Sequence, residues 1–199
     1  HMAAESRIGP SIQNPQKAFE INILGTTNVL QCSRENNIKR LVYSSTSSGY
    51  GLNNLPNIET QSDDCLNPYS VTKVAGEELC KMFNNLFNLN TVILRYFNVY
   101  GERQIKKGNM ATVIGIFEHQ YMQNKPLTLV RPGTQTRRFT HISDTVEICF
   151  KAWKLNKCRH YSITNKKSYS IKDVAKMFDT KVRYLPPRKG ERYASALTN

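Results

Sequence analysis

The segment VYSSTSSGYG, residues 42–51, contains the end of a predicted β-strand followed at once by a run of hydroxyl side chains. Together with the residues before it, IKRLVYSS at positions 38–45 is a short apolar and β-branched run bounded by polar residues. Such a run predicts a buried strand of a parallel sheet. The five hydroxyl residues from Ser44 to Ser48 make this strand end the first place to look for chemistry.

Helical patterns lie on both sides of this strand. Residues 14–37 have apolar side chains at roughly helical spacing with Pro15 in the first turn, and residues 68–88 follow a 3.6-residue period. A second buried-strand pattern begins in the segment TVILRYFNVYG, residues 91–101, which ends in a polar, aromatic loop. This order predicts an α/β fold that forms the C-terminal part of a doubly wound, Rossmann-like parallel sheet. The chain contains no G-x-G-x-x-G turn of the kind that opens such a sheet.

The pattern changes after Arg103, where the expected elements become shorter. We expect helices and extended segments at 110–124, 128–142, 143–155, 160–164, 170–178 and 181–185. The chain therefore divides into a partial Rossmann-like domain at residues 1–103 and a smaller α+β region at 104–199. Within the second region, strand 159–164 is expected to return to the main sheet.

Composition excludes several classes of protein. The chain has 199 residues, 39% of them hydrophobic, which is enough for a globular core. No apolar run approaches the ~20 residues of a membrane span, and the N-terminus lacks the order of a signal peptide, so a soluble cytoplasmic protein is expected. The five cysteines are widely spaced without a CxxC pair, which predicts reduced thiols and no metal site.

The formal net charge is +13, from 28 basic and 15 acidic residues. A nucleic-acid-binding protein would gather its Lys and Arg residues on one face among aromatic side chains, whereas here they are scattered, so we expect no nucleic acid partner. Two explanations stay open. The protein takes a small anionic substrate, or the chain is a fragment whose missing part carries the compensating acidic residues.

Tyr69 and Lys73 in YSVTK have the i, i+4 spacing that places two side chains on one face of a helix. An ammonium beside a phenol favours the phenolate, which is how a group with a normal pKa near ~10 becomes a base at neutral pH. Chance pairs of this kind are common. The hydroxyl run strengthens the functional interpretation, because both features are expected at the carboxyl edge of the sheet, where α/β proteins bind ligands.

Seven motifs in order resemble those of the extended short-chain dehydrogenase/reductases, in particular the nucleotide-sugar epimerases and dehydratases. They are HMAA at 1–4, NILGTTNVL at 22–30, VYSSTSSGYG at 42–51, YSVTK at 69–73, LRYFNVYGERQ at 94–104, GTQTRRFTHISD at 133–144 and RKGE at 188–191. The resemblance covers nearly the whole chain and is greatest to the UDP-glucose and UDP-N-acetylglucosamine 4-epimerases.

The resemblance implies a tightly held NAD and a catalytic group of three residues. Thr46 would hydrogen-bond the sugar 4-hydroxyl, and Tyr69 would remove its proton while hydride leaves C4. Lys73 would hold the nicotinamide ribose and lower the pKa of Tyr69. The 4-keto sugar would then turn over and receive the hydride on its other face.

Further residues are matched to binding roles by the same resemblance. The expected cofactor contacts are Asn22, Ser44, Ser45, Tyr69, Lys73 and Tyr96. The expected contacts to a nucleotide-diphosphate sugar, a UDP-hexose, are Thr46, Asn98, Arg137 and Arg188. The paired donors of an arginine suit the oxygens of a diphosphate.

The residues after Thr46 bear on the type of reaction. Related 4,6-dehydratases and decarboxylases have a carboxylate there, whereas this chain has Ser47, Ser48 and Gly49. We therefore expect a 4-epimerase, with a 4,6-dehydratase or decarboxylase as the alternative. The identity of the sugar stays open.

Relative to the family, the chain is expected to begin after the fourth strand and to lack the glycine-rich turn. We therefore expect the isolated chain to bind NAD poorly and to turn over little, unless the missing half is supplied by another polypeptide. A non-catalytic nucleotide-sugar-binding or oligomerising remnant is a further alternative. The family also implies a homodimer through the helices at about 14–37 and 69–88.

Overall fold

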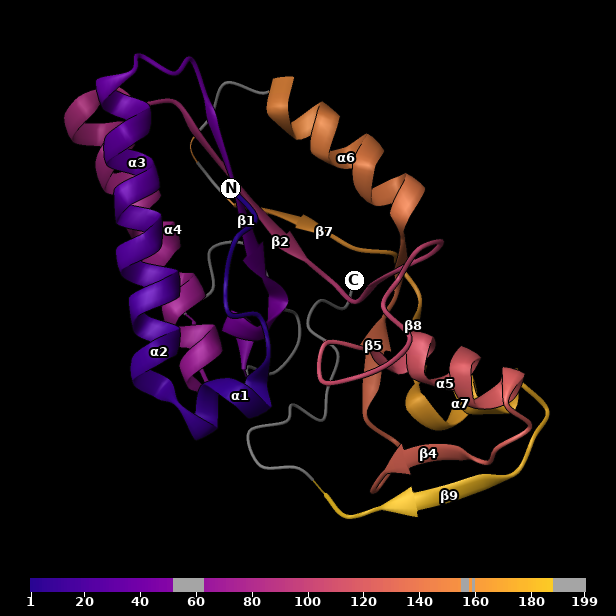
Figure 1. The fold of residues 1–199 in the computed structure, drawn as a ribbon. Helices are drawn as coiled ribbons and strands as arrows, with labels where there is room; N and C mark the ends of the chain where they lie inside the picture. The colour runs from indigo at the N-terminus through magenta and orange to yellow at the C-terminus, as the bar shows by residue number, and fades with distance from the viewer. Residues whose placement is uncertain (52–62, 155–157, 159, 188–199) are drawn as a thin grey trace.

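The computed structural model describes residues 1–51, 63–154, 158 and 160–187 (Figure 1). Its main sheet is parallel and has the strand order β1 (Leu41–Thr46), β2 (Thr91–Tyr96) and β7 (His160–Ile163). Leu41 lies opposite Thr91 and Ile93 opposite His160, so the carboxyl ends of the three strands meet at one edge. The predicted α/β fold is confirmed.

One face of the sheet is covered by the first helices and by α4 (Pro68–Phe87), and the other by α6 (Ile142–Lys154) (Figure 1). The α4 face buries Leu30, Tyr43, Cys80, Phe83 and Ile93, among others. The α6 face buries a second cluster, which consists of Val92, Leu94, Ala152 and Ile163. The apolar strands therefore have both faces buried, as the continuous apolar runs predict for a parallel sheet.

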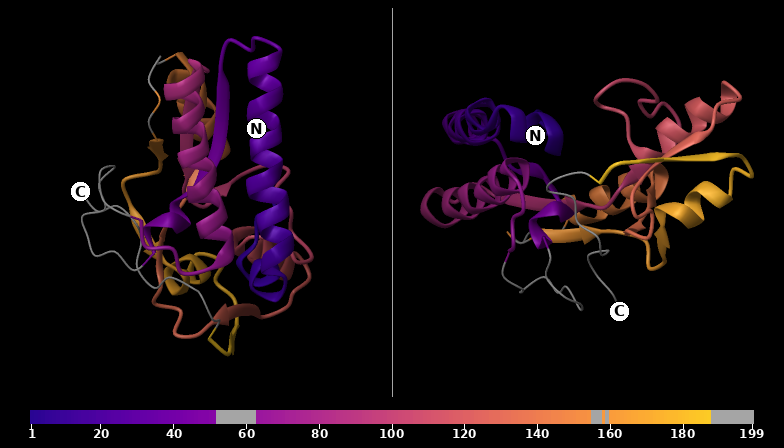
Figure 2. Two further views of the ribbon diagram at one scale, coloured as in Figure 1. Left: turned by 90° about the vertical axis from the view of Figure 1, so that its left-hand side faces the viewer. Right: turned by 90° about the horizontal axis from the view of Figure 1, so that it is seen from below.

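The long helix predicted at 14–37 is present but interrupted. It consists of α2 (Pro15–Phe19), a π-helical turn (Glu20–Leu24) and α3 (Gly25–Glu35), and in Figure 2 this run stands alongside α4. Asn14 caps its start by accepting a hydrogen bond from the Lys17 N–H at 3.1 Å. Before it lies a short helix, α1 (Ile8–Gln13), that the sequence pattern did not predict.

Helix α4 has well-defined ends. Asn67 and Ser70 form a reciprocal capping box, and Pro68 occupies the first turn, where its missing N–H costs nothing. The helix ends at Asn88, which adopts a left-handed conformation with φ of 54°. Between strand β1 and this helix, residues 47–50 form a 3₁₀ turn that carries the chain away from the sheet edge.

The second region contains short elements that pair over long sequence distances. Strand β4 (Leu127–Val130) pairs in parallel with β9 (Val182–Leu185), and β5 (Thr136–Arg138) pairs antiparallel with β8 (Ser168–Ser170). Helices α5 (Val113–Met122) and α7 (Ile171–Lys176) pack with β4 around a core of Phe117, Leu127, Leu129, Ile171, Val174 and Ala175.

A two-residue ladder joins this region to the end of the main sheet. The strand predicted from residue 91 ends at Tyr96, and the polar, aromatic segment expected after it contains Asn98, with a φ of 38°, and the short strand β3 (Val99–Tyr100). Strand β3 pairs with β6 (Thr140–His141), which leads directly into α6. None of the helices in the described part of the chain has the length and apolar character that crossing a bilayer requires.

Candidate active site

A cavity of about 1020 Å³ lies at the carboxyl edge of the main sheet and extends to the second region. The hydroxyl run at the end of β1 forms one wall and α4 contributes Tyr69 and Lys73. The opposite wall includes Asn98 and Arg137. Because strand ends and helix starts of an open α/β sheet converge at this edge, it is where ligands bind in such folds.

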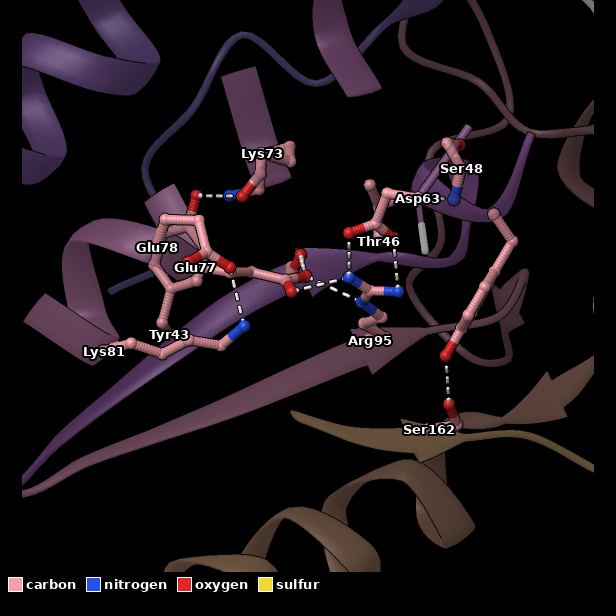
Figure 3. A network of polar contacts seen from close by, with 12 residues as sticks. Tyr43, Thr46, Ser48, Asp63, Lys73, Glu77, Glu78, Lys81, Arg95 and Ser162 are labelled. Atoms are coloured by element: carbon pink, nitrogen blue, oxygen red, sulfur yellow. Dashed lines mark hydrogen bonds and ion pairs between the residues drawn. The ribbon is translucent and has the colours of Figure 1, made fainter. Parts of the chain in front are cut away.

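Thr46 is the hydroxyl residue that contacts Tyr69. It is the last residue of β1, and its Oγ1 accepts a hydrogen bond from the Ser48 N–H at 3.1 Å, which fixes the side chain (Figure 3). Hydrogen bonding with the Thr46 side chain also lowers the pKa of the Tyr69 phenol, and both residues line the cavity. The structure thus brings together two of the residues expected to share a substrate hydroxyl.

The phenol of Tyr69 is held at the start of α4. Its backbone N–H, one of the donors left free by helix geometry, is bonded to Oγ of Ser11 at 3.1 Å. Burial raises the pKa of the Tyr69 phenol, while the hydrogen bond with Thr46 and the positive charge of Arg7 lower it part of the way back. Arg7 is thus a cation that lowers the pKa of Tyr69 in this structure, and the expected effect of Lys73 on Tyr69 stays a prediction.

Lys73 has a different environment from the one that the sequence suggested. The side chain is buried, and its ammonium lies over the ring of Tyr43, 4.2 Å from the ring centroid. Burial lowers the pKa of Lys73 from 10.5 to about 8, against smaller raising effects of Cys80 and Glu77. Among the described residues the Tyr43 ring is the direct contact of the Lys73 ammonium. Because a ring face is not a hydrogen-bond acceptor, the N–H donors of Lys73 stay available at the cavity wall.

The buried ammonium makes a testable contribution to stability. Below pH 8 the Lys73 proton is bound in both the folded and the unfolded state, so the fold bears the full cost of burying the ammonium. Between about pH 8 and 10.5 only the unfolded chain retains the proton, so this cost falls as pH rises. We expect Lys73→Met to be more stable than the wild type at pH 7, with an advantage that shrinks towards pH 9.5. Urea unfolding of nucleotide-free protein at several pH values measures the difference. A constant difference would contradict it.

The expected cofactor residues from the two strands line the cavity in different ways. Ser44 Oγ lies 3.4 Å from the Tyr96 phenol oxygen, and Tyr96 is also within 3.5 Å of Cys149 Sγ. Ser45 instead donates its hydroxyl to Glu77, behind the cavity wall. Ser44 and Tyr96 thus present a pair of hydroxyl groups at the strand ends.

Asn22 does not reach the cavity. It lies in the π-helical turn, where its amide exchanges two hydrogen bonds with the Glu5 backbone at 2.7 and 3.0 Å and donates to Thr72 Oγ1 at 2.8 Å. The Asn22 amide is therefore occupied by hydrogen bonds within the protein. In this structure Asn22 therefore fixes residues 1–7 against α4, and the expected cofactor contact stays a prediction.

The residues matched to a diphosphate lie on the opposite wall. The Asn98 amide donates to the Arg138 carbonyl at 2.9 Å, and the Arg137 Nη1 donates to the carbonyl of Thr136 at 2.8 Å. Both side chains line the cavity. Arg188 falls outside the described residues.

A sequence model of the NAD dependent epimerase/dehydratase family matches residues 1–164. The chain belongs to this family. Residues 1–164 include the hydroxyl run, the Tyr69 and Lys73 pair and both described residues of the opposite wall, so the match covers the described site.

Several members of the NAD dependent epimerase/dehydratase family are similar to this chain. The putative UDP-glucose 4-epimerase of Methanocaldococcus jannaschii is 36% identical over 201 residues, which cover 97% of this chain and 65% of that protein. The UDP-glucose 4-epimerase of Thermotoga maritima, solved with UDP-glucose, matches with a TM-score of 0.94 and 27% identity, covering 99% of this chain and 66% of that one. The UDP-glucuronic acid 4-epimerase of Bacillus cereus, solved with UDP-glucuronic acid and NAD, matches with a TM-score of 0.90 and 30% identity. The match covers 99% of this chain and 65% of that one. The chain thus spans about two thirds of the length of these relatives.

A buried ion-pair network supports this epimerase/dehydratase site from behind (Figure 3). The Arg95 guanidinium makes two hydrogen bonds to Glu77, at 2.8 and 2.7 Å, and contacts Asp63 at 2.9 and 3.1 Å. Arg95 is 1% exposed and Glu77 is fully buried. Although burial opposes the charged form, the hydrogen bonds and charges of Glu77 and Asp63 raise the pKa of Arg95 above its ordinary value. The network reaches the cavity wall through the hydroxyl of Ser45.

Sequence reasoning missed this network and the contribution of α1. A signal for the network was available, because an arginine inside the apolar run TVILRYF must have a buried partner if the run is a buried strand. No such signal marked Arg7 or Ser11, which lie just before and within α1, a helix without a clear apolar period. Folding alone brings Arg7 and Ser11 close to Tyr69.

Proposed function

We propose that this chain carries the catalytic and sugar-binding part of an NAD-dependent nucleotide-sugar 4-epimerase acting on UDP-hexoses. The observation that carries the proposal is that Thr46, Tyr69 and Lys73 line one cavity at the carboxyl edge of the sheet. A hydroxyl shared between these two groups is placed for proton transfer. Similarity to the 4-epimerases of M. jannaschii and T. maritima supports the same reaction.

The side chains at the strand ends fit the nicotinamide ribose of the cofactor that the family uses. The Lys73 ammonium is buried at the cavity wall without a hydrogen-bond acceptor among the described residues, and Ser44 and Tyr96 add hydroxyl groups beside it. A ribose diol supplies the acceptors that an ammonium requires. When bound there, NAD supplies the chemistry of hydride removal from C4 and hydride return.

The protein's own contribution is proton transfer and orientation. Tyr69 takes the proton of the sugar 4-hydroxyl and returns it, while the Thr46 hydroxyl holds that oxygen in line with the phenol. Since burial raises the pKa of Tyr69, a nearby cation is needed to favour the phenolate, and Arg7 provides that charge. Asn98 and Arg137 on the opposite wall would bind the diphosphate.

The charge of the cavity favours epimerisation over the alternative reactions. Among the described residues that line it, none is Asp or Glu. A 4,6-dehydratase needs an acid and a base for elimination in addition to the tyrosine. The described lining of the cavity has no carboxylate that could take either role. We therefore rank the dehydratase and decarboxylase second.

Two further features belong to this proposal. We propose that the enzyme is a cytoplasmic homodimer assembled through the helical run from α2 to α3 and through α4. The outer faces of the helices on this side expose large apolar side chains, which favours burial in an interface. They are Phe19, Ile21, Leu24, Val71, Met82, Leu86 and Phe87.

The proposed activity is tested with the full gene product that contains residues 1–199. It is incubated with NAD and separately with UDP-glucose, UDP-N-acetylglucosamine and UDP-glucuronate, and the products are followed by NMR. We expect conversion of at least one sugar to its 4-epimer. A 4-keto-6-deoxy sugar would identify a dehydratase and released carbon dioxide a decarboxylase, and absence of any product would contradict the proposal.

A further inference from the structure

The cavity has more positive charge than binding of a cofactor ribose and a diphosphate requires. Its described lining includes three cationic side chains, Arg7, Lys73 and Arg137, and no Asp or Glu. In the proposed function Lys73 faces the ribose and Arg137 the diphosphate. Arg7 lies at the Tyr69 end of the cavity, and the proposed function gives it only an effect on the charge of Tyr69, without a group of the ligand as its partner.

The position of Arg7 is fixed by α1. Arg7 is the residue before this helix, and its carbonyl accepts the N–H of Ser11 at 3.1 Å. The Ser11 hydroxyl in turn accepts the Tyr69 N–H at 3.1 Å, and α1 packs against α4. Arg7 and Tyr69 are therefore held near one another, and each affects the ionisation of the other.

The Arg7 guanidinium lines the cavity and is only partly paired. Its Nη2 donates to the Met110 carbonyl, whereas its Nε is buried and has no hydrogen-bond partner among the described residues. A buried charged donor without an acceptor is unfavourable, so a site that keeps one is suited to an anionic ligand. The planar guanidinium matches the two oxygens of a carboxylate better than it matches a neutral hydroxyl.

We propose that Arg7 binds a carboxylate on the sugar, so that the preferred substrate class is a nucleoside-diphosphate hexuronate; this rests on the proposed epimerase function. In a hexuronate the carboxylate is attached to C5, next to the C4 whose hydroxyl is shared by Thr46 and Tyr69. A cation beside Tyr69 is thus within reach of it. The diphosphate is attached to C1, on the far side of the sugar ring, which makes it an unsuitable partner for Arg7.

The test compares UDP-glucuronate with UDP-glucose in the full gene product. Affinity is measured by calorimetry, and kcat/KM by NMR, for the wild type, Arg7→Gln and Arg7→Lys. We expect the wild type to prefer UDP-glucuronate, and Arg7→Gln to reduce that preference about 10- to 100-fold, which corresponds to the loss of a hydrogen-bonded charge pair. Arg7→Lys should recover part of it. Unchanged affinity for UDP alone checks that the variants are folded.

Arg137→Gln is the matched control, because it removes the other cavity arginine. We expect Arg137→Gln to lower the affinities for UDP, UDP-glucose and UDP-glucuronate by similar factors. A wild-type preference for UDP-glucose would overturn the inference. So would equal losses for both sugars in Arg7→Gln with a shifted pH profile, because Arg7 would then act on Tyr69 alone. Absence of turnover with every sugar counts against the proposed function, while the binding preference still decides the role of Arg7.

Discussion

Tyr69→Phe is expected to lower kcat for 4-epimerisation by about 10²- to 10⁴-fold, the range typical for loss of a positioned proton-transfer group. The ring of phenylalanine keeps the packing at the start of α4, but the phenol that contacts Thr46 is gone. Substrate affinity should change little, because Asn98 and Arg137, the proposed diphosphate-binding residues on the opposite wall, stay intact. NMR assays at saturating substrate measure the effect.

Tyr121→Phe on α5 is the matched control, since Tyr121 is 52% exposed and lies outside the cavity lining. Its kcat should equal that of the wild type. The pH profile adds a second criterion. If Tyr69 is the base, the acid limb of kcat/KM reports its ionisation in the wild type and is absent from the residual activity of Tyr69→Phe. Equal rates in wild type and Tyr69→Phe would remove Tyr69 from the mechanism.

The elements of the main sheet could be predicted because local pattern and long-range packing agree there. The strand containing Tyr43 is buried on both faces, so its apolar run is continuous, and α4 shows a helical period because one of its faces covers the sheet. The π-helical turn at Glu20–Leu24 was invisible, since it shifts the helix by a fraction of a turn without changing the apolar pattern. Asn22 lies in this turn, which directs its amide to Glu5 and Thr72 rather than to the cavity.

The short elements of the second region could be predicted as short extended pieces, but their partners could not. Segment 128–142 contains the end of β4 and all of β5 and β6, which pair with three different partners. Those partners are set by tertiary contacts, because two- and three-residue strands have no periodicity of their own. Arg137 and Asn98 owe their places on the cavity wall to this pairing.

The same limit applies to the candidate site. Thr46, Tyr69 and Lys73 could be grouped, because the ends of parallel strands and the helix that follows converge at a known edge. The position of the Lys73 ammonium over Tyr43 depends on side-chain packing that the i, i+4 spacing does not determine. Arg7 was not predicted, because the hydrogen bond from Tyr69 to Ser11 spans 58 residues of sequence.

Glu77→Gln is expected to reduce the free energy of unfolding by about 3–5 kcal/mol, because it leaves a buried arginine without its main counter-charge. Arg95 is 1% exposed and cannot turn to solvent, and its ring partner Tyr50 is also fully buried. Asp63 still contacts Arg95, but its side chain is 25% exposed and screens the charge less well. Urea unfolding with an unchanged m-value measures the loss as stability rather than a change in compactness.

A double variant separates the charge from the packing. Replacing both partners with apolar residues of similar length, Glu77→Leu with Arg95→Met, removes the unpaired charge and should restore most of the stability that Glu77→Gln loses. Glu147→Gln, which breaks the exposed pair with Lys151 on α6, should cause no measurable change. If Glu77→Gln and Glu147→Gln behaved alike, the network behind Ser45 would be no more than a solvated ion pair, and support of the cavity wall would have to come from the apolar core alone.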